Sequence, residues 1–452
     1  MTRVCGLVVN DAGAERLAGL LASLPAVGSG SGRHAHTELL LCPRLGAGAA
    51  AAEALLVGAA RAVGRCSRLR SLILLVDQDV QPADQLPATF WQRLADARAL
   101  EDLKLFTLSS CSADARGAPS TASASRMMAG LAGLSQLRAL DLTAHGPCEH
   151  VTLPACFSRL VQLTSLSLCG LRGLRFAPGW ARLPALEFLE FEDCEFAGGS
   201  EDALPGMVAL AALTSLQLWD CPSLRVLPAA LWRLTRLRSL AHDTRTWCSL
   251  PRGALPVAGP LAAGAPWLAS LTHLTLAGLN LPVFPPGALA ATRLAHLDLS
   301  QCSFERLPSG VSALTALTAL HLGRHAPGPA EVGGTFDARA LGGLAGFPKL
   351  QRLRFGNCSV LFCSDLGAAA AHPRLERLEV VAAYPAPGPS CRAFLGLTVA
   401  LLQQGRPDAI ELRDCAVQGA GQVESDSFLA ALDAVGYLPA EHQRALLAAG
   451  YT

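Results

Sequence analysis

Charged residues are scarce in this sequence: they make up 16% of its 452 residues, and the formal net charge is +1. Lysine is nearly absent, since Lys104 and Lys349 are the only two. A chain with so little net charge produces no overall field that would attract nucleic acid or an anionic membrane surface. We therefore expect neither of them as a partner.

Long apolar runs are also absent, although hydrophobic residues account for 51% of the chain. No stretch approaches the roughly 18 consecutive apolar residues of a membrane-spanning helix, so we expect no membrane span. The apolar run at residues 4–9 is shorter than the core of a secretory signal peptide. These absences favour a cytoplasmic protein, and the cytoskeleton or a ciliary axoneme is the alternative location.

Two common site motifs are missing as well. The fifteen cysteines include no C-x-x-C pair, the spacing typical of zinc and redox sites. No G-x-x-x-x-G-K-[ST] sequence occurs, because neither lysine follows a glycine-rich loop, so the sequence does not support a P-loop nucleotide switch. Aromatic residues make up only 5% of the chain, so leucine and alanine must supply most of the core.

What the sequence does contain is a repeated leucine pattern. It is clearest in residues 294–322, which read L-x-x-L-x-L-x-x-C-x-F from Leu294, and the next unit starts 23 residues later at Leu317. This is the spacing of a leucine-rich repeat. The sequence contains about thirteen regular repeats. We identify each one by the second leucine of its L-x-x-L-x-L unit, which we call the central residue: Leu72, Leu103, Leu140, Leu166, Leu189, Leu216, Leu240, Leu274, Leu297, Leu320, Leu353, Leu378 and Ile410.

The predicted fold is therefore an α/β leucine-rich repeat solenoid, a curved horseshoe with a parallel β-sheet on its concave side. Residues 69–415 form the repeats, residues 1–68 form divergent N-terminal repeats or a cap, and residues 416–452 form a C-terminal helical cap. Strands are expected at 4–9 and 37–42 and cap helices at 425–438 and 439–450. Four Pro/Gly/Ser-rich inserts should project from one edge of the solenoid: 112–125, 251–266, 325–334 and 384–391.

The return segments carry a Leu-Pro phrase, clearest in LRVLPAALWRLTRLRSL (224–240) and FERLPSGVSALTALTAL (304–320). This phrasing resembles the repeats of plant disease-resistance proteins and of plant intracellular Ras-group-related LRR proteins. The resemblance covers residues 69–415 and implies the solenoid fold. Because this repeat serves many partners, it implies protein binding only in general. The nucleotide-binding module that precedes the repeats in disease-resistance proteins has no counterpart in this sequence.

Strand periodicity predicts which side chains face the concave surface. The last two leucines of each unit are two residues apart and share the core face, so positions −1, +1 and +3 from the central leucine point away from the core. Equivalent positions on adjacent strands lie about 4.8 Å apart. Five cysteines occupy the inward turn after a strand and should be buried and inert: Cys194, Cys221, Cys302, Cys358 and Cys415.

This mapping gives a predicted partner-binding surface in three parts. The acidic and aromatic part is Phe188, Glu190, Glu192, Trp219 and Asp243; the histidine part is His273, His296, Asp298 and His321; and the basic part is Arg352, Arg354 and Arg377. Trp219 is the predicted anchor of a protein partner, because exposed tryptophans are common hot spots; packing over neighbouring strands is the alternative. The arginines could receive a carboxylate or phosphate group or form a solvated face.

The histidine part has three interpretations. Imidazole and carboxylate groups could bind a metal ion, or the histidines could make partner binding depend on pH. A solvated polar ladder is the favoured interpretation, so we predict neither a metal nor a cofactor.

Catalysis is not expected. Ser300, His321 and Asp298 include the residue types of a catalytic triad, but an open strand face lacks an oxyanion hole and shelter from water. Cys363 begins the C-x-D sequence of bacterial LRR ubiquitin ligases, whose catalytic helical domain is not present here. The predicted function is non-catalytic protein recognition. The alternatives are a defence or signalling sensor, a cytoskeletal or ciliary scaffold, and a substrate-recognition subunit of a ubiquitin ligase.

Overall fold

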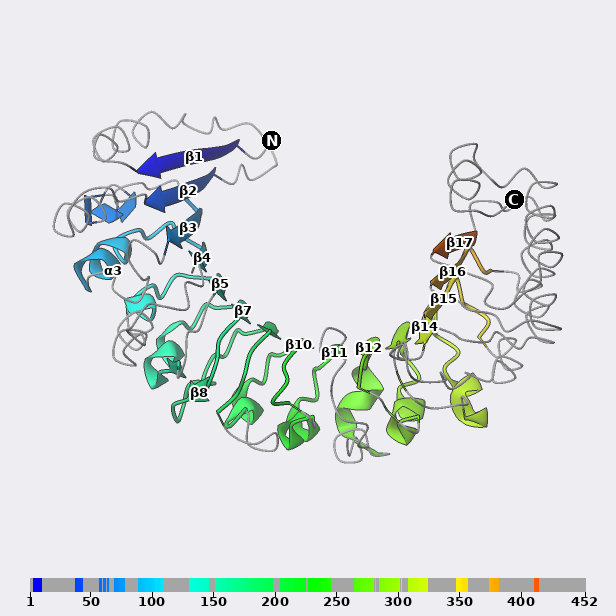
Figure 1. Ribbon diagram of the computed structural model, residues 1–452. Helices are drawn as coiled ribbons and strands as arrows, with labels where there is room; N and C mark the ends of the chain where they lie inside the picture. The colour runs from blue at the N-terminus through cyan, green and yellow to red at the C-terminus, as the bar shows by residue number, and fades with distance from the viewer. Residues whose placement is uncertain are drawn as a thin grey trace, which may run out of the picture. The chain divides into compact units, whose positions relative to one another are not determined.

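The computed structural model in Figure 1 divides into two compact units, residues 1–237 and 238–452. It describes 3–9, 37–43, 57–58, 60–61, 63–64, 69–77, 88–108, 130–145, 151–197, 204–224, 227–244, 264–279, 281, 284–300, 302, 308–323, 347–356, 374–381 and 410–413. None of the helices in these ranges is both long and apolar enough to cross a bilayer.

The first unit is built on eight parallel strands, which adjoin one another in chain order within the described residues. They are β1 (Arg3–Val9), β2 (Thr37–Pro43), β3 (Ser71–Asp77), β4 (Asp102–Leu108), β5 (Ala139–His145), β7 (Ser165–Cys169), β9 (Phe188–Glu192) and β10 (Ser215–Trp219). The return segments contain β6 (Thr152–Leu153), β8 (Arg175–Phe176), α3 (Ala88–Leu94), η2 (Ala155–Arg159), η3 (Met207–Ala209) and η4 (Ala229–Arg233).

The second unit repeats the arrangement with seven described strands in chain order. They are β11 (Ser239–Asp243), β12 (His273–Thr275), β13 (His296–Leu299), β14 (Ala319–Gly323), β15 (Arg352–Gly356), β16 (Arg377–Val381) and β17 (Ile410–Arg413). Three 3-10 helices lie between them: η5 (Pro266–Ser270), η6 (Pro286–Ala290) and η7 (Ser309–Ala313).

The strand register aligns the predicted central residues within each unit. In the first unit Leu72, Leu103, Leu140, Leu166, Leu189 and Leu216 pair in succession. In the second unit, successive pairing joins the central residues Leu240, Leu274, Leu297, Leu320, Leu353, Leu378 and Ile410. Each repeat thus places its leucines against those of its neighbours. The leucine-rich repeat architecture predicted from the leucine spacing is confirmed.

The predicted N-terminal strands are present as β1 and β2, which pair with each other, and β2 pairs with β3 in the same parallel sense. Most of the four predicted inserts and all of the C-terminal cap helices lie outside the described residues. The predicted repeat boundaries at residues 68 and 415 stay predictions.

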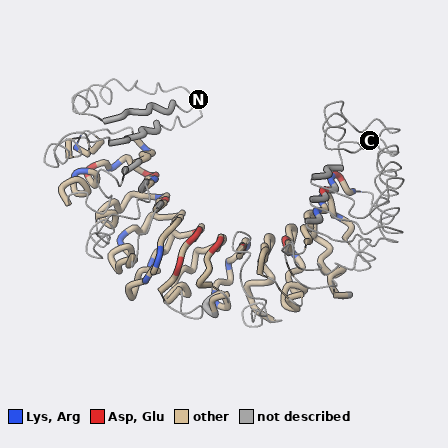
Figure 2. Tube along the Cα trace, viewed as in Figure 1, with Lys and Arg blue, Asp and Glu red and all other residues tan. Residues whose placement is uncertain are grey.

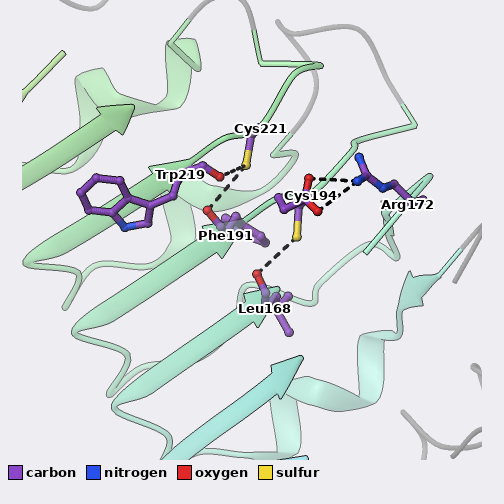
Figure 3. A network of polar contacts seen from close by, with 7 residues as sticks. Leu168, Arg172, Phe191, Cys194, Trp219 and Cys221 are labelled. Atoms are coloured by element: carbon purple, nitrogen blue, oxygen red, sulfur yellow. Dashed lines mark hydrogen bonds and ion pairs between the residues drawn. The ribbon is translucent and has the colours of Figure 1, made fainter. Parts of the chain in front are cut away.

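Three of the predicted turn cysteines, Cys194, Cys221 and Cys302, are fully buried. Their thiols donate to carbonyl oxygens of earlier repeats: Cys194 to Leu168 at 3.3 Å and Cys221 to Phe191 at 3.5 Å, as Figure 3 shows. Cys302 donates to the carbonyl oxygen of Leu276, the residue after β12, at 3.2 Å. Each cysteine therefore fills a turn and ties it to the repeat before it. Cys358 and Cys415 lie outside the described residues.

These thiols should resist alkylation in the native protein. Burial raises the pKa of Cys194 to about 12 and also raises the pKa values of Cys221 and Cys302, while the thiolate is the reactive form. Native treatment with iodoacetamide should leave all three unmodified and modify the partly exposed Cys156, as mapped by peptide mass spectrometry. Equal labelling of Cys194 and Cys156 would contradict the inert assignment; labelling in denaturant is the positive control.

A threonine two residues before the central leucine adds a second link between repeats. The hydroxyls of Thr164 and Thr214 donate to the carbonyl oxygens of Arg138 and Glu187, at 3.0 and 3.1 Å. Thr272 and Thr318 make the same bond in the second unit, at 3.0 and 2.9 Å. In all four cases the acceptor is the equivalent residue of the preceding repeat, so the side chain reinforces the strand pairing.

One residue shortly after the end of several strands adopts a left-handed backbone. Gly170, Asp193, Asp220 and Gly278 have φ values of 75°, 47°, 50° and 74°, and each lies four residues after its central leucine. This conformation turns the chain sharply out of the strand. It is accessible to glycine and, at lower cost than for most residues, to aspartate.

Candidate functional site

The strands present alternate residues on the two faces of the sheet. In β7, β9 and β10 the central leucine and the residue two positions later are buried, and the residues between them are partly exposed. We call the face that carries positions −1, +1 and +3 the sheet face. It is the surface on which the predicted partner-binding residues were placed.

On the first unit, the sheet face of β7, β9 and β10 brings carboxylates and an aromatic ring together. Glu190 lies between Ser167 and Gln217 in the strand register, and Glu192 lies between Cys169 and Trp219. We call Ser167, Glu190, Glu192, Gln217 and Trp219 the β7–β10 surface. Figure 3 shows the Trp219 side chain on the opposite side of its strand from Cys221, directed away from the core.

Hydrogen bonds orient the β7–β10 surface from within. The Ser167 hydroxyl donates to Glu190 at 2.8 Å. The indole Nε1–H of Trp219 donates to the side-chain oxygen of Gln217 at 2.9 Å. Both bonds run between side chains on the same face, so they hold the carboxylate and the ring in place before any partner arrives.

The charge of the β7–β10 surface is negative. Within the described part of the chain, no ion pair involves Glu190 or Glu192, whereas nearby Asp193 is paired with Arg172 at 2.9 Å. The pKa of the Cys169 thiol rises to about 12, through burial first and then through the adjacent Glu192 carboxylate. Figure 2 shows the acidic residues gathered along the first unit where β9 and β10 lie.

On the second unit, β13 and β14 bring three polar side chains together. Asp298 is opposite His321 in the register, and their Oδ2 and Nδ1 atoms are 3.3 Å apart. The ring of His296 lies edge-to-face against that of His321, with centroids 4.9 Å apart. One ligand atom from each residue can be chosen so that all three lie within 4.8 Å of one another. We call His296, Asp298 and His321 the histidine cluster.

Asp298 is the charged centre of the histidine cluster. Its burial alone would raise the pKa of the carboxyl, but hydrogen bonds with His321 and Ser300 outweigh this and lower it to about 2. Burial, together with the neighbouring His321, lowers the pKa of His296. At neutral pH the cluster therefore contains an ionised carboxylate beside a neutral His296 imidazole.

Two predicted site residues differ from the expectation that they face solvent. Asp243 is only 3% exposed and Asp298 only 5% exposed, so neither can contribute much contact area to a partner. The Asp298 side chain is held against the backbone just after β13, where its Oδ1 accepts the N–H of Ser300 at 2.9 Å.

His273 also differs from the prediction, because it stands apart from the cluster. It pairs with His296 in the register, but the ring centroids are 6.0 Å apart. Its side chain is exposed, and its Nδ1 lies 2.9 Å from the Thr272 hydroxyl. Of the four residues predicted as the histidine part, three therefore lie together in the structure and His273 does not.

The predicted basic part is present on β15 and β16. Arg352 and Arg377 are direct neighbours in the register, and both are exposed. Arg354 pairs with Glu379, with 3.4 Å between Nε and Oε1.

Phe188, the remaining predicted residue, is half-buried on β9 next to Ser165 and Ser215.

Sequence reasoning placed Gln217 on the same face as Glu190 and Trp219, but it gave no role to Ser167 or to the Ser300 backbone. Ser167 and Gln217 occupy position +1 of their repeats, so the register could have placed them beside Glu190. Their hydrogen bonds depend on side-chain rotamers, which no spacing rule predicts. The N–H of Ser300 is directed by the local turn of the backbone, and no residue type signals it.

Comparison with known proteins finds only distant structural similarity. No protein-family model and no curated protein matches the chain. An LRR protein of Leptospira interrogans is 16% identical, with a TM-score of 0.43, covering 82% of this chain and 90% of that one. The LRR ectodomain of the Arabidopsis thaliana receptor kinase GASSHO1/SCHENGEN3 is 15% identical, with a TM-score of 0.35, covering 87% and 54%. The Arabidopsis HAESA ectodomain is 16% identical, with a TM-score of 0.26, covering 84% and 65%.

Proposed function

We propose that this protein is a non-catalytic protein-recognition module whose β7–β10 surface binds a basic segment of a partner protein. The observation that carries the proposal is the grouping of Glu190, Glu192 and Trp219 on adjacent strands, without an ion pair to either glutamate among the described residues. Carboxylates that the protein does not neutralise itself favour a partner that supplies arginine or lysine.

Trp219 gives this surface an aromatic anchor beside the charges. An arginine side chain could lie over the indole while its guanidinium group bonds to Glu190 or Glu192, combining a cation–π contact with charge-assisted hydrogen bonds. The bond from Trp219 to Gln217 already fixes the ring. Less side-chain entropy is then lost on binding, and this preorganisation favours affinity.

The arrangement of Ser300, Asp298 and His321, the residue types of a catalytic triad, supports a non-catalytic role. In a serine hydrolase the histidine lies between the serine and the acid. Here the carboxylate of Asp298 lies between the other two residues, because it accepts the backbone N–H of Ser300 and faces Nδ1 of His321. We retain the cytoplasm as the proposed location.

The proposal is tested by fluorescence anisotropy with a labelled arginine-rich peptide as the probe. Trp219→Ala should weaken binding about 30-fold, the effect of a typical hot spot. The double variant Glu190→Gln/Glu192→Gln should weaken it about 10-fold or more and flatten its dependence on salt.

The control is Glu195→Gln, which removes one negative charge, where the double variant removes two, at an exposed position after the end of β9. It should bind the peptide as the wild type does. The proposal fails if the wild type binds an equally long glutamate-rich peptide as well, or if Glu195→Gln weakens binding as much as the double variant.

A further inference from the structure

The histidine cluster has the composition of a metal site that retains an open coordination position. Two imidazoles and one carboxylate are a ligand set found at catalytic zinc and non-haem iron centres. The three residues come from the adjacent strands β13 and β14, and their candidate ligand atoms lie within 4.8 Å of one another. We propose that His296, Asp298 and His321 bind a divalent transition-metal ion of the zinc type.

The spacing of Asp298 and His321 suits such an ion. Two ligand atoms, each about 2.0–2.1 Å from a tetrahedral zinc ion, are about 3.3–3.4 Å apart. The observed separation of Oδ2 and Nδ1 is 3.3 Å. This is longer than the most common N–H···O hydrogen bond of about 2.9–3.0 Å. An ion could therefore bind between these two atoms with little movement of either strand, and His296, whose ligand atom lies within 4.8 Å of theirs, would supply the third ligand.

The carboxylate is already held in the orientation that a ligand needs. Its Oδ1 accepts the Ser300 backbone N–H at 2.9 Å, which leaves Oδ2 directed towards His321. The flanking residues Leu297 and Leu299 are fully buried, so β13 is anchored in the core. Metal sites commonly rely on such outer hydrogen bonds to fix their ligands.

The surrounding charges permit a cation. Arg354 is opposite His321 in the register, but its guanidinium group pairs with Glu379 on the far side, at 3.4 Å. Arg352 is separated from His296 by Ala319 in the same row of the sheet. Asp298 would bring a carboxylate oxygen to the ion. With three protein ligands, the remaining position would hold water.

The test uses the full chain, freed of metal by chelation and dialysis under reducing conditions. Zinc binding is measured by competition with a chromophoric chelator, and Co²⁺ is the spectroscopic probe. The wild type should bind one zinc ion, and the variants His296→Gln and His321→Gln should bind it at least 100-fold more weakly. His273→Gln, the matched control on the neighbouring strand, should bind it as the wild type does.

The cysteines require a second readout, because thiolates also bind zinc. A Co²⁺ site made of nitrogen and oxygen ligands gives visible d–d absorption without the near-ultraviolet sulfur charge-transfer band. The proposal predicts that the difference spectrum between the wild type and His321→Gln lacks that band. Equal stoichiometry and affinity in the wild type, His296→Gln and His321→Gln would overturn it. So would a difference spectrum dominated by sulfur. Circular dichroism confirms that both variants fold.

Discussion

Replacing Phe191 with alanine is expected to lower the free energy of unfolding by about 3–5 kcal/mol, the usual cost of removing a fully buried phenylalanine. Phe191 has no exposed surface. Its ring contacts Phe176 and Phe196 edge-on, with centroids 6.0 and 5.2 Å away. The truncation would leave a cavity between two repeats, which strand pairing prevents from closing. Urea denaturation followed by circular dichroism measures the loss.

Phe188→Ala is the matched control, because it removes the same side chain from the same strand on the opposite face. Phe188 is half-buried on the sheet face, so its loss should cost only a fraction of the Phe191 value. Both variants keep the composition and length of β9 otherwise unchanged. If the two variants unfolded at the same urea concentration, the assignment of core and sheet faces in this strand would be wrong.

Gly170→Ala is the second substitution with a large expected effect, about 2–5 kcal/mol from two additive causes. Gly170 has a φ of 75°, which is strained for alanine. An added Cβ would also lie 1.9 Å from the backbone carbonyl oxygen of Ala144. A backbone atom cannot move aside by changing rotamer, so the turn or β5 must shift. The N–H of Gly170 also donates to Glu192 O at 2.9 Å, so a shift would weaken a bond between repeats.

Gly179→Ala separates the two causes. Gly179 has a similar φ of 85°, but an added Cβ would meet its nearest neighbour, Nε of Arg182, only at 3.9 Å. This variant should show the conformational cost alone, about 1–2 kcal/mol. The same denaturation measurement compares the two. A loss at Gly179 as large as at Gly170 would show that steric overlap with Ala144 is unimportant.

The sequence was sufficient to predict the repeat and its register. Leucines such as Leu297 and Leu320 recur in the same L-x-x-L-x-L spacing, and two-residue periodicity places them on the buried face. The turn cysteines Cys194, Cys221 and Cys302 followed from the same spacing. These features depend only on chain periodicity and on which residues avoid water, so they can be read without coordinates.

The site was less predictable, because it depends on rotamers and local turns. Position in the strand placed Asp298 on the sheet face but did not show that it folds back to Ser300 and becomes buried. His273 and His296 occupy equivalent positions, but β13 lies between β12 and β14, so only His296 is on the strand next to that of His321. The register brings candidates within one strand spacing of each other. Which atoms then meet is decided by side-chain torsions and hydrogen bonds.

The left-handed residue after each of several strands has a consequence for how this chain can change by mutation. The position is held by Gly170, Asp193, Asp220 and Gly278. Codons for aspartate and glycine can differ by a single nucleotide at their second base, and aspartate and asparagine codons can differ by one at the first. These are the residues that tolerate the left-handed conformation best. A repeat can therefore exchange a neutral turn residue for a charged one in one mutational step, without an intermediate that strains the backbone. Charge at this edge of the sheet can change while the fold is kept.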